Sequence, residues 1–391
     1  MGSEGLEPTY FRCSVTKDAL VIHPQMSYYA GGELLCLYVC KALQEAGYKV
    51  TLACDVFSPA DAERFFGLGS VVRQCGYRKI AKFSPTLPYF VSLQRIPYAI
   101  RMRTLLAKTD ADVVFSTQSS SFYIPKRKLF HFVYNVLDLF NHPPGSNLSG
   151  PASSKEPLKK PYYFLLRQAR RIFWDRYSPT PAIFFAVGSL VLQDLKDRGY
   201  QNSRLIFPPC RTSFKPKLPK KKQVVQYTRI LPNKRIELFS EIAQLLPQYP
   251  FYIVGRTPTE RSGVNHDYSQ RILRGLPRNV TYVDALTRER PDLLENSKVY
   301  LYTGTEAGIG IALVEAIAAG CIPFTPYGVG AVDIIETAGV GQLFSSAQQA
   351  AKKIETTLEA EQTAQEIYAI SDKANMFSPE SFEEQIRQIV N

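Results

Sequence analysis

The chain has 391 residues, which is long enough for two domains of ordinary size. Hydrophobic residues make up 45% and charged residues 21%, a globular composition that excludes an intrinsically disordered chain. The net charge of +12 lies in one half, because residues 1–213 carry 27 Lys and Arg against 15 Asp and Glu, whereas residues 214–391 carry 20 of each. This asymmetry predicts a polyanionic or membrane-surface partner for the first half, or else a basic solvated face.

The sequence shows no membrane-spanning or secretion signal. No apolar run approaches the ~20 residues of a transmembrane helix, and the N-terminus lacks the basic and apolar regions of a signal peptide. The seven cysteines are scattered and form no CxxC pair, which predicts buried, reduced thiols rather than a disulfide framework or a zinc site. We therefore expect a cytoplasmic protein that is at most peripheral to a membrane.

In the first half, apolar strands alternate with amphipathic helices. A strand over residues 19–23, the glycine pair Gly31–Gly32, a helix over 33–46 and a strand over 50–54 form a β-α-β unit. Residues 141–161 are rich in Pro, Ser, Gly and Lys and predict a long loop. The other elements expected here are strands at 113–117, 129–136 and 182–186 and helices at 162–177 and 189–197.

The basic, proline-bearing segment 214–222 predicts a linker, after which the α/β alternation repeats. The elements expected in the second half are strands at 224–227, 251–254, 280–283, 299–303 and 322–325 and helices at 236–246, 311–319, 331–338 and 378–390. The fold class predicted is α/β, with two doubly wound parallel sheets that face each other across a cleft. The boundaries are an N-terminal domain over 1–213, a C-terminal domain over 214–376, and a terminal helix over 377–391 that packs back toward the N-terminal domain.

A glycine-rich loop between a strand and a helix, within residues 302–321, indicates a ligand site. Glycines let the backbone approach an anion closely, and the first amides of a helix bind phosphate. A carboxylate one turn into the helix can reach ribose hydroxyls, and Glu306 in the loop can hold sugar hydroxyls. The loop predicts a phosphorylated ligand. The alternative is that its glycines only form a turn before an alanine-rich helix that packs in the core. The donor-binding residues predicted in this segment are Gly308, Gly310, Ile311, Ala312, Leu313 and Glu315.

Two further segments could contact the same ligand. Arg229 follows a predicted strand and Lys234 opens the next helix, so the two cations could grip a diphosphate together, although such a loop is often only solvated. Gly31 and Gly32 would allow a ligand to approach the first turn of the N-terminal domain, unless they form an ordinary turn.

Taken in order, the three segments resemble the family 4 retaining glycosyltransferases of the GT-B fold. That family has a Gly-Gly loop in its first domain, an Arg-x4-Lys pair early in its second domain, and a late Glu-Gly-Phe-Gly-x4-Glu signature. Here the late signature corresponds to Ala307-Gly-Ile-Gly-x4-Glu315, so the family's first glutamate falls on Ala307 and the nearest carboxylate, Glu306, lies one residue earlier. The resemblance implies transfer of a sugar from a nucleoside diphosphate sugar, either GDP-mannose or a UDP-sugar, without a metal or another cofactor.

The resemblance also implies which residues act. The catalytic residues it implies are Arg229, Lys234, Glu306 and Tyr134. Tyr134 takes the place of a histidine that the family often carries on the strand expected at 129–136. His131 should point to the opposite face of that strand, and His142 and His23 are weaker candidates for which a structural role is the alternative.

The basic first half suggests where the acceptor binds. The basic aromatic helix over 162–177 and the apolar stretch over 85–98 could lie on an anionic bilayer, unless they pack in the domain core. We expect a lipid-linked or glycolipid acceptor, similar to those of mannosyltransferases of lipid-linked oligosaccharide assembly, and an anionic membrane surface as partner. The residues expected to contact acceptor or membrane are Arg167, Arg170, Arg171 and Trp174.

Other functions stay open at this point. The acceptor could be soluble, or the chain could be a catalytically silent GT-B protein that serves as a binding or partner subunit, which the position of Glu306 would favour. Nucleic acid is not an expected partner, because the sequence has no RNA-recognition signature and no zinc finger.

Overall fold

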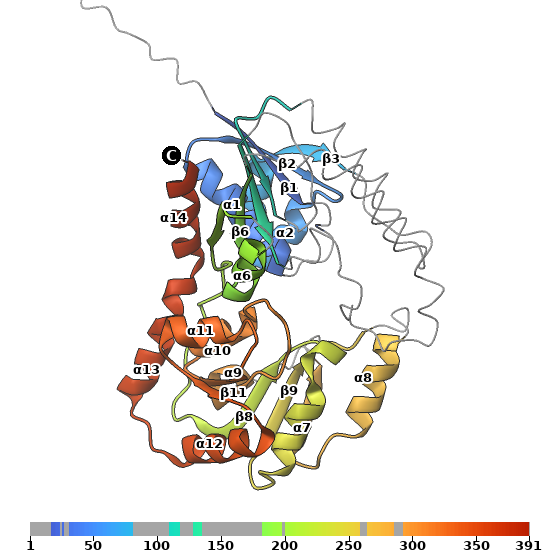
Figure 1. The fold of residues 1–391 in the computed structure, drawn as a ribbon, viewed down its shortest axis with the longest axis vertical. Helices are drawn as coiled ribbons and strands as arrows, with labels where there is room; N and C mark the ends of the chain where they lie inside the picture. The colour runs from blue at the N-terminus through green and yellow to red at the C-terminus, as the bar shows by residue number, and fades with distance from the viewer. Residues whose placement is uncertain are drawn as a thin grey trace, which may run out of the picture.

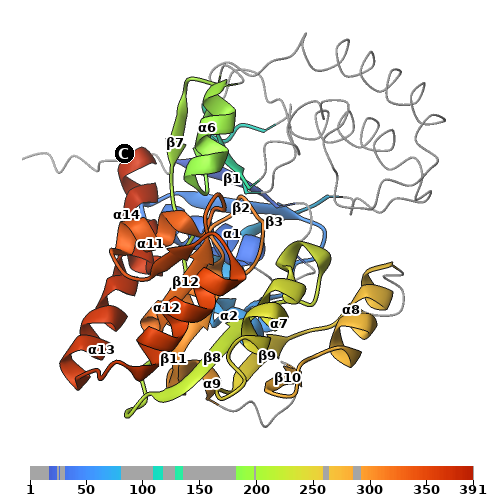
Figure 2. The ribbon, with the colours of Figure 1, turned by 60° about the horizontal axis from the view of Figure 1, so that its bottom comes forward.

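The computed structural model describes residues 17–23, 26, 31–80, 109–117, 128–134, 182–197, 200–258, 264–284 and 292–390. These residues form two α/β domains, each built on one parallel sheet (Figures 1 and 2). The fold class predicted from the sequence is therefore confirmed.

The N-terminal sheet has the strand order β3-β2-β1-β4-β5-β6-β7. Its strands are β1 (Asp18–His23), β2 (Lys49–Cys54), β3 (Gly76–Lys79), β4 (Val113–Ser116), β5 (Lys128–Val133), β6 (Ala182–Ala186) and β7 (Ser203–Leu205). The described helices of this domain are α1 (Gly31–Glu45), α2 (Pro59–Phe66), α3 (Gly69–Gln74) and α6 (Ser189–Asp197). Parallel strands of a doubly wound sheet are covered on both faces and read as apolar runs, and β1 is buried from its second residue to its end.

The C-terminal sheet has the order β10-β9-β8-β11-β12-β13. Its strands are β8 (Lys221–Tyr227), β9 (Phe251–Gly255), β10 (Val280–Asp284), β11 (Ser297–Leu301), β12 (Ile322–Pro326) and β13 (Gln342–Phe344). The helices are α7 (Ile236–Gln244), α8 (Val264–Arg274), α9 (Leu293–Asn296), α10 (Ile311–Ala318), α11 (Val332–Ala338), α12 (Ala347–Glu359), α13 (Ala364–Asp372) and α14 (Pro379–Val390), with 3-10 turns η6 (Pro232–Lys234) and η8 (Lys373–Phe377).

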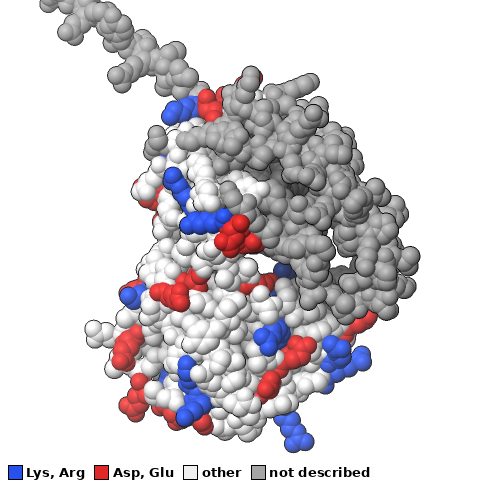
Figure 3. All heavy atoms as spheres, in the orientation of Figure 1, with Lys and Arg blue, Asp and Glu red and all other residues white. Residues whose placement is uncertain are grey.

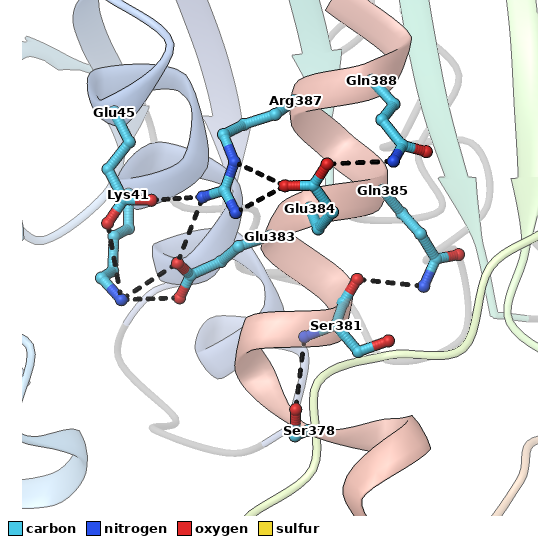
Figure 4. A network of polar contacts seen from close by, with 9 residues as sticks. All are labelled: Lys41, Glu45, Ser378, Ser381, Glu383, Glu384, Gln385, Arg387 and Gln388. Carbon is cyan, nitrogen blue, oxygen red and sulfur yellow. Dashed lines mark hydrogen bonds and ion pairs between the residues drawn. The ribbon is translucent and has the colours of Figure 1, made fainter.

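Helix α14 leaves the C-terminal domain and runs along α1 of the N-terminal domain (Figure 1). Ser378 accepts a hydrogen bond from the Ser381 amide at 3.2 Å, as expected of the helix-capping serine. The apolar face of α14 is buried in the N-terminal core through Phe382, Ile386 and Val390. Alongside this face, the buried Glu383 carboxylate accepts hydrogen bonds from Lys41 at 2.7 and 3.0 Å (Figure 4).

The structure adds short or polar elements that the sequence pattern did not predict. These are β3, β7, β13 and helices α2, α3, α8, α9, α12 and α13. Strand β8 begins at Lys221, inside the segment 214–222 that was predicted as a linker, so the connection between the two sheets ends before that residue. The predicted loop over 141–161, the helix over 162–177 and the apolar stretch over 85–98 lie outside the described residues.

The charges on the surface and the character of the helices are relevant to the predicted membrane partner. On the face drawn in Figure 3, basic side chains are interspersed with acidic ones over the C-terminal domain, in keeping with its balanced charge. Among the described helices, none combines the length and the apolar character needed to cross a membrane.

Candidate functional site

The first half of the site lies where β1 ends and α1 begins. A Cβ placed on Gly32 would lie 3.7 Å from both the His23 imidazole and the Tyr134 hydroxyl, an ordinary contact distance, so these two side chains lie next to the start of the helix. Tyr134 donates a hydrogen bond to the Thr117 carbonyl at 3.1 Å. The carboxyl ends of β1, β4 and β5 therefore bring His23, Thr117 and Tyr134 together beside α1, where open parallel sheets bind ligands.

His23 is buried in a network of polar groups. The Thr117 hydroxyl donates to the Ile22 carbonyl and so can accept the proton of His23 Nδ1, which lies 2.9 Å away. His23 Nε2 lies 3.6 Å from the buried Glu33 carboxylate. Burial alone would lower the pKa of His23, but the neighbouring Cys36 sulfur and Glu33 carboxylate outweigh burial and raise it to about 9. These two neighbours therefore favour the cationic form of the imidazole.

His131 lies on the opposite face of the same sheet, as its place in the strand predicted. Its ring packs edge-on against Phe184, with centroids 5.8 Å apart, and its Nε2 has no hydrogen-bond partner. Burial lowers the pKa of His131 to about 4. This histidine therefore stays neutral and takes no part in the site, whereas Tyr134 does face it. His142 lies outside the described residues.

The second half of the site is the glycine loop before α10. Gly310 holds a φ of 67° at the N-cap position, in the left-handed region that favours glycine, and α10 has neither a side-chain cap nor an acidic residue in its first turn. The Leu313 amide already donates to the Gly310 carbonyl at 2.8 Å, so the amides at the start of the helix that a ligand could contact are those of Ile311 and Ala312. Gly308 sits in open space, with nothing within 4 Å of a Cβ placed there.

Lys234 and Glu306 meet next to this loop. The Lys234 ammonium forms an ion pair with Glu306 Oε2, and the Asn233 side-chain amide donates to Glu306 Oε1 at 2.9 Å. The Tyr302 hydroxyl donates to Oε2 at 3.3 Å. Glu306 therefore holds a defined position beside the predicted diphosphate-binding lysine, while Ala307 at the motif position is exposed.

Arg229 is exposed just after β8. Its position depends on Gly255 at the end of β9, because a Cβ there would lie 1.6 Å from the Thr228 carbonyl oxygen. The carboxylate of Glu315 is buried in α10 and forms an ion pair with Arg211 at 3.2 Å. Sequence reasoning missed Arg211, Asn233 and Gly255, since each owes its role to a contact with a distant segment. Of the three, only Asn233 could have been found from the sequence, because it is next to the predicted Lys234.

The two halves of the site touch directly. A Cβ on Gly31, the first residue of α1, would lie 2.5 Å from Cδ1 of Ile311, the first residue of α10. The N-termini of two helices from different domains therefore face each other. The expected acceptor residues Arg167, Arg170, Arg171 and Trp174 lie outside the described residues. Within the part of the chain that the structure describes, no three His, Cys, Asp or Glu side chains are grouped to hold a metal ion.

Comparisons with known proteins agree with this architecture. Residues 211–373 match the family model described as Glycosyl transferases group 1. A search of curated proteins finds no match. Among solved structures, HepE (Alr3699) of Anabaena in complex with UDP and glucose is 15% identical at a TM-score of 0.62, covering 95% of this chain and 98% of that one.

Two other solved structures are similar over the same extent. Sucrose-phosphate synthase of Thermosynechococcus elongatus is 15% identical at a TM-score of 0.65, covering 96% of this chain and 98% of its own. WaaG, a glycosyltransferase involved in lipopolysaccharide biosynthesis, is 13% identical at 0.63, covering 95% and 99%. The chain thus has the GT-B fold of glycosyltransferases, and its C-terminal domain carries the Glycosyl transferases group 1 match.

Proposed function

We propose that the protein is a retaining glycosyltransferase of family 4 type that moves a sugar from a nucleoside diphosphate sugar to an acceptor. The observation that carries this proposal is the meeting of two helix N-termini, with Gly31 against Ile311 and the Lys234–Glu306 pair alongside. Helix N-termini attract anions, and the start of α10, which has no acidic residue in its first turn, would hold the diphosphate of a sugar nucleotide beside Lys234.

In this reaction the cationic side chains and helix amides of the site would stabilise the diphosphate leaving group. When the sugar–oxygen bond breaks, negative charge grows on the diphosphate, and Arg229, Lys234 and the first amides of α10 can stabilise it. We expect no metal to be required, because these groups supply the positive charge. Glu306, held beside Lys234, would contact hydroxyls of the transferred sugar. In a retaining transfer of this kind the acceptor attacks from the face that the diphosphate leaves, so no carboxylate nucleophile is needed.

For the nucleotide, the candidates are a UDP-sugar and GDP-mannose. HepE was solved with UDP and with UDP-glucose, which supports testing uridine nucleotides first. Glu315 would bind the ribose hydroxyls from one turn into α10, and its ion pair with Arg211 would orient the carboxylate.

The acceptor we propose is a lipid-linked molecule or glycolipid at an anionic membrane surface, met by a peripheral, cytoplasmic enzyme. The supporting observation is the excess of Lys and Arg in residues 1–213. WaaG acts in lipopolysaccharide biosynthesis, which makes glycolipid acceptors a reasonable first panel.

The proposal is tested by nucleotide binding and turnover. UDP, GDP, ADP and their common sugars are added to the purified protein, and the melting temperature should rise with one of them by mass action. The double variant Arg229→Ala/Lys234→Ala should lose that rise, whereas Lys353→Ala, on the far helix α12, should keep it. No rise with any nucleotide would contradict the donor site. Binding without transfer to soluble or lipid acceptors would identify a silent binding subunit instead.

A further inference from the structure

The two domains also touch at a second place, where α6 of the N-terminal domain meets α11 of the C-terminal domain (Figure 1). Asp333 Oδ2 accepts a hydrogen bond from the Ser189 amide at 2.5 Å, and Oδ1 accepts one from the Ser189 hydroxyl at 2.5 Å. Ser189 is the first residue of α6, so a carboxylate from one domain caps a helix of the other. Asp333 is buried, and both of its side-chain oxygens accept a hydrogen bond in this pairing.

The loop that carries Glu306 is held between these same two elements. The Gly330 amide, in the turn before α11, donates to the Glu306 carbonyl at 2.9 Å. A Cβ on Gly330 would lie 2.0 Å from the Ala307 carbonyl oxygen. From the other domain, a Cβ on Gly188 would lie 3.1 Å from that same oxygen and 3.5 Å from the Ile309 side chain. The backbone on both sides of the loop therefore sets where Glu306 sits.

This contact differs in kind from the one made by α14. Helix α14 buries Phe382, Ile386 and Val390 in the N-terminal core and adds the Lys41–Glu383 ion pair (Figure 4), so separating it would expose a large apolar surface. The Ser189–Asp333 contact consists of two hydrogen bonds from an exposed serine, which can break and reform as the domains move. The α14 side therefore acts as the hinge, and the Ser189 side is where the domains can separate.

We propose that Asp333 is a positioning residue that couples closure of the two domains to the placement of Glu306. The inference rests on the proposed glycosyltransferase function, because Glu306 is assigned there to the transferred sugar. When Asp333 binds Ser189, Gly188 comes against the Ala307 carbonyl and the loop is fixed from both sides. When the contact opens, the loop loses its support from the N-terminal domain. Glu306 then keeps only the contacts of its own domain, from Gly330, Asn233 and Lys234, and is held less firmly against the donor.

The test compares Asp333→Ala, Asp333→Glu and Ser189→Ala with the wild-type protein, using the nucleotide sugar that stabilises the wild-type protein most. We expect Asp333→Ala to lower kcat about tenfold while nucleotide affinity stays within about twofold, since misplacement of a reacting group affects turnover more than binding. Asp333→Glu keeps both acceptor oxygens and should recover part of kcat. Ser189→Ala should have a smaller effect, and the double variant should be no worse than Asp333→Ala alone.

Small-angle scattering gives a second readout that needs no substrate. Asp333→Ala should have a larger radius of gyration than the wild-type protein. Glu336→Gln removes an exposed carboxylate from the same helix and serves as the control that should change neither kcat nor compactness. Unchanged kcat in an active enzyme, or an unchanged radius of gyration in Asp333→Ala, would overturn the coupling. A wild-type protein that binds no nucleotide contradicts the proposed function instead, and scattering would still decide whether this contact closes the domains.

Discussion

Helices α1 and α10 each follow a central strand of their sheet, β1 and β11, yet the surroundings of their N-termini differ. Helix α1 carries Glu33 in its first turn, buried and paired with His23, so the positive end of this helix already faces a carboxylate. Helix α10 has no acidic residue in its first turn and begins after Gly310, which lies in the left-handed region. The comparison favours α10 over α1 as the helix start that would receive an anion, with the polar side chains at the start of α1 opposite it.

The largest effect should come from separating the two helix starts. Gly31→Ala places a methyl group 2.5 Å from Ile311 Cδ1, so either the Ile311 side chain turns away or the two helix starts move apart. Either change alters the space between the helix starts, and because a shift of about 1 Å at a reacting centre can cost about a hundredfold in rate, we expect kcat/KM to fall by up to that factor. Ile311→Ala should restore much of the activity in the double variant, because it removes the clashing atom. A double variant as inactive as Gly31→Ala alone would show that the contact does not limit the reaction.

A smaller effect is expected on the α10 side, at Glu306. Glu306→Gln keeps the shape but weakens the ion pair with Lys234 and the bond to the sugar, so kcat should fall roughly tenfold. Ala307→Glu added to Glu306→Ala should not restore activity, because residue 307 is exposed while the Lys234 ammonium reaches residue 306. Steady-state kinetics decide, and rescue by Ala307→Glu would mean that position 307 holds the catalytic carboxylate.

How far the sequence predicts this site depends on whether its signals are local. The glycine loop before α10 and the pair Arg229 and Lys234 could be predicted, because strand-to-helix turns carry recognisable residues. The ion pair of Lys234 with Glu306 could not, since the two residues are 72 positions apart and meet only when β8 and β11 pair. The same holds for Asp333 and Ser189, which come from different domains.

The fold shows the same division. Long apolar strands such as β1 and β9 were predicted within a residue or two, because strands covered on both faces are apolar throughout. Strand β3 was missed because it lies at the sheet edge with most of its residues exposed. Helix α12, with its glutamines, lysines and threonines, has few large apolar residues to reveal its period, although six of its residues are buried.

On the α1 side, Glu33→Gln should change electrostatics more than rate. Removing the carboxylate leaves the Cys36 sulfur alone to offset burial, so the pKa of His23 should fall below about 9. NMR titration of the His23 ring protons in the variant and the wild-type protein measures it. Activity near neutral pH should change only a few-fold. A His23 pKa that does not move would show that Glu33 does not hold the charge.

The smallest effect on activity is expected from His131, which lies on the sheet face away from both helix starts. Burial holds its pKa near 4, whereas an unfolded histidine titrates near 6.5, so the unfolded chain binds the extra proton between these values. Its contribution to stability is complete above about pH 6.5 and is lost as pH falls toward 4, with a slope of at most about 1.4 kcal/mol per pH unit. His131→Phe should flatten this slope in denaturant unfolding at pH 7 and pH 5, and should leave kcat unchanged. If the variant instead lowers kcat with its stability intact, the two faces of the N-terminal sheet are coupled. His131 would then affect the polar side chains beside α1 from the opposite face.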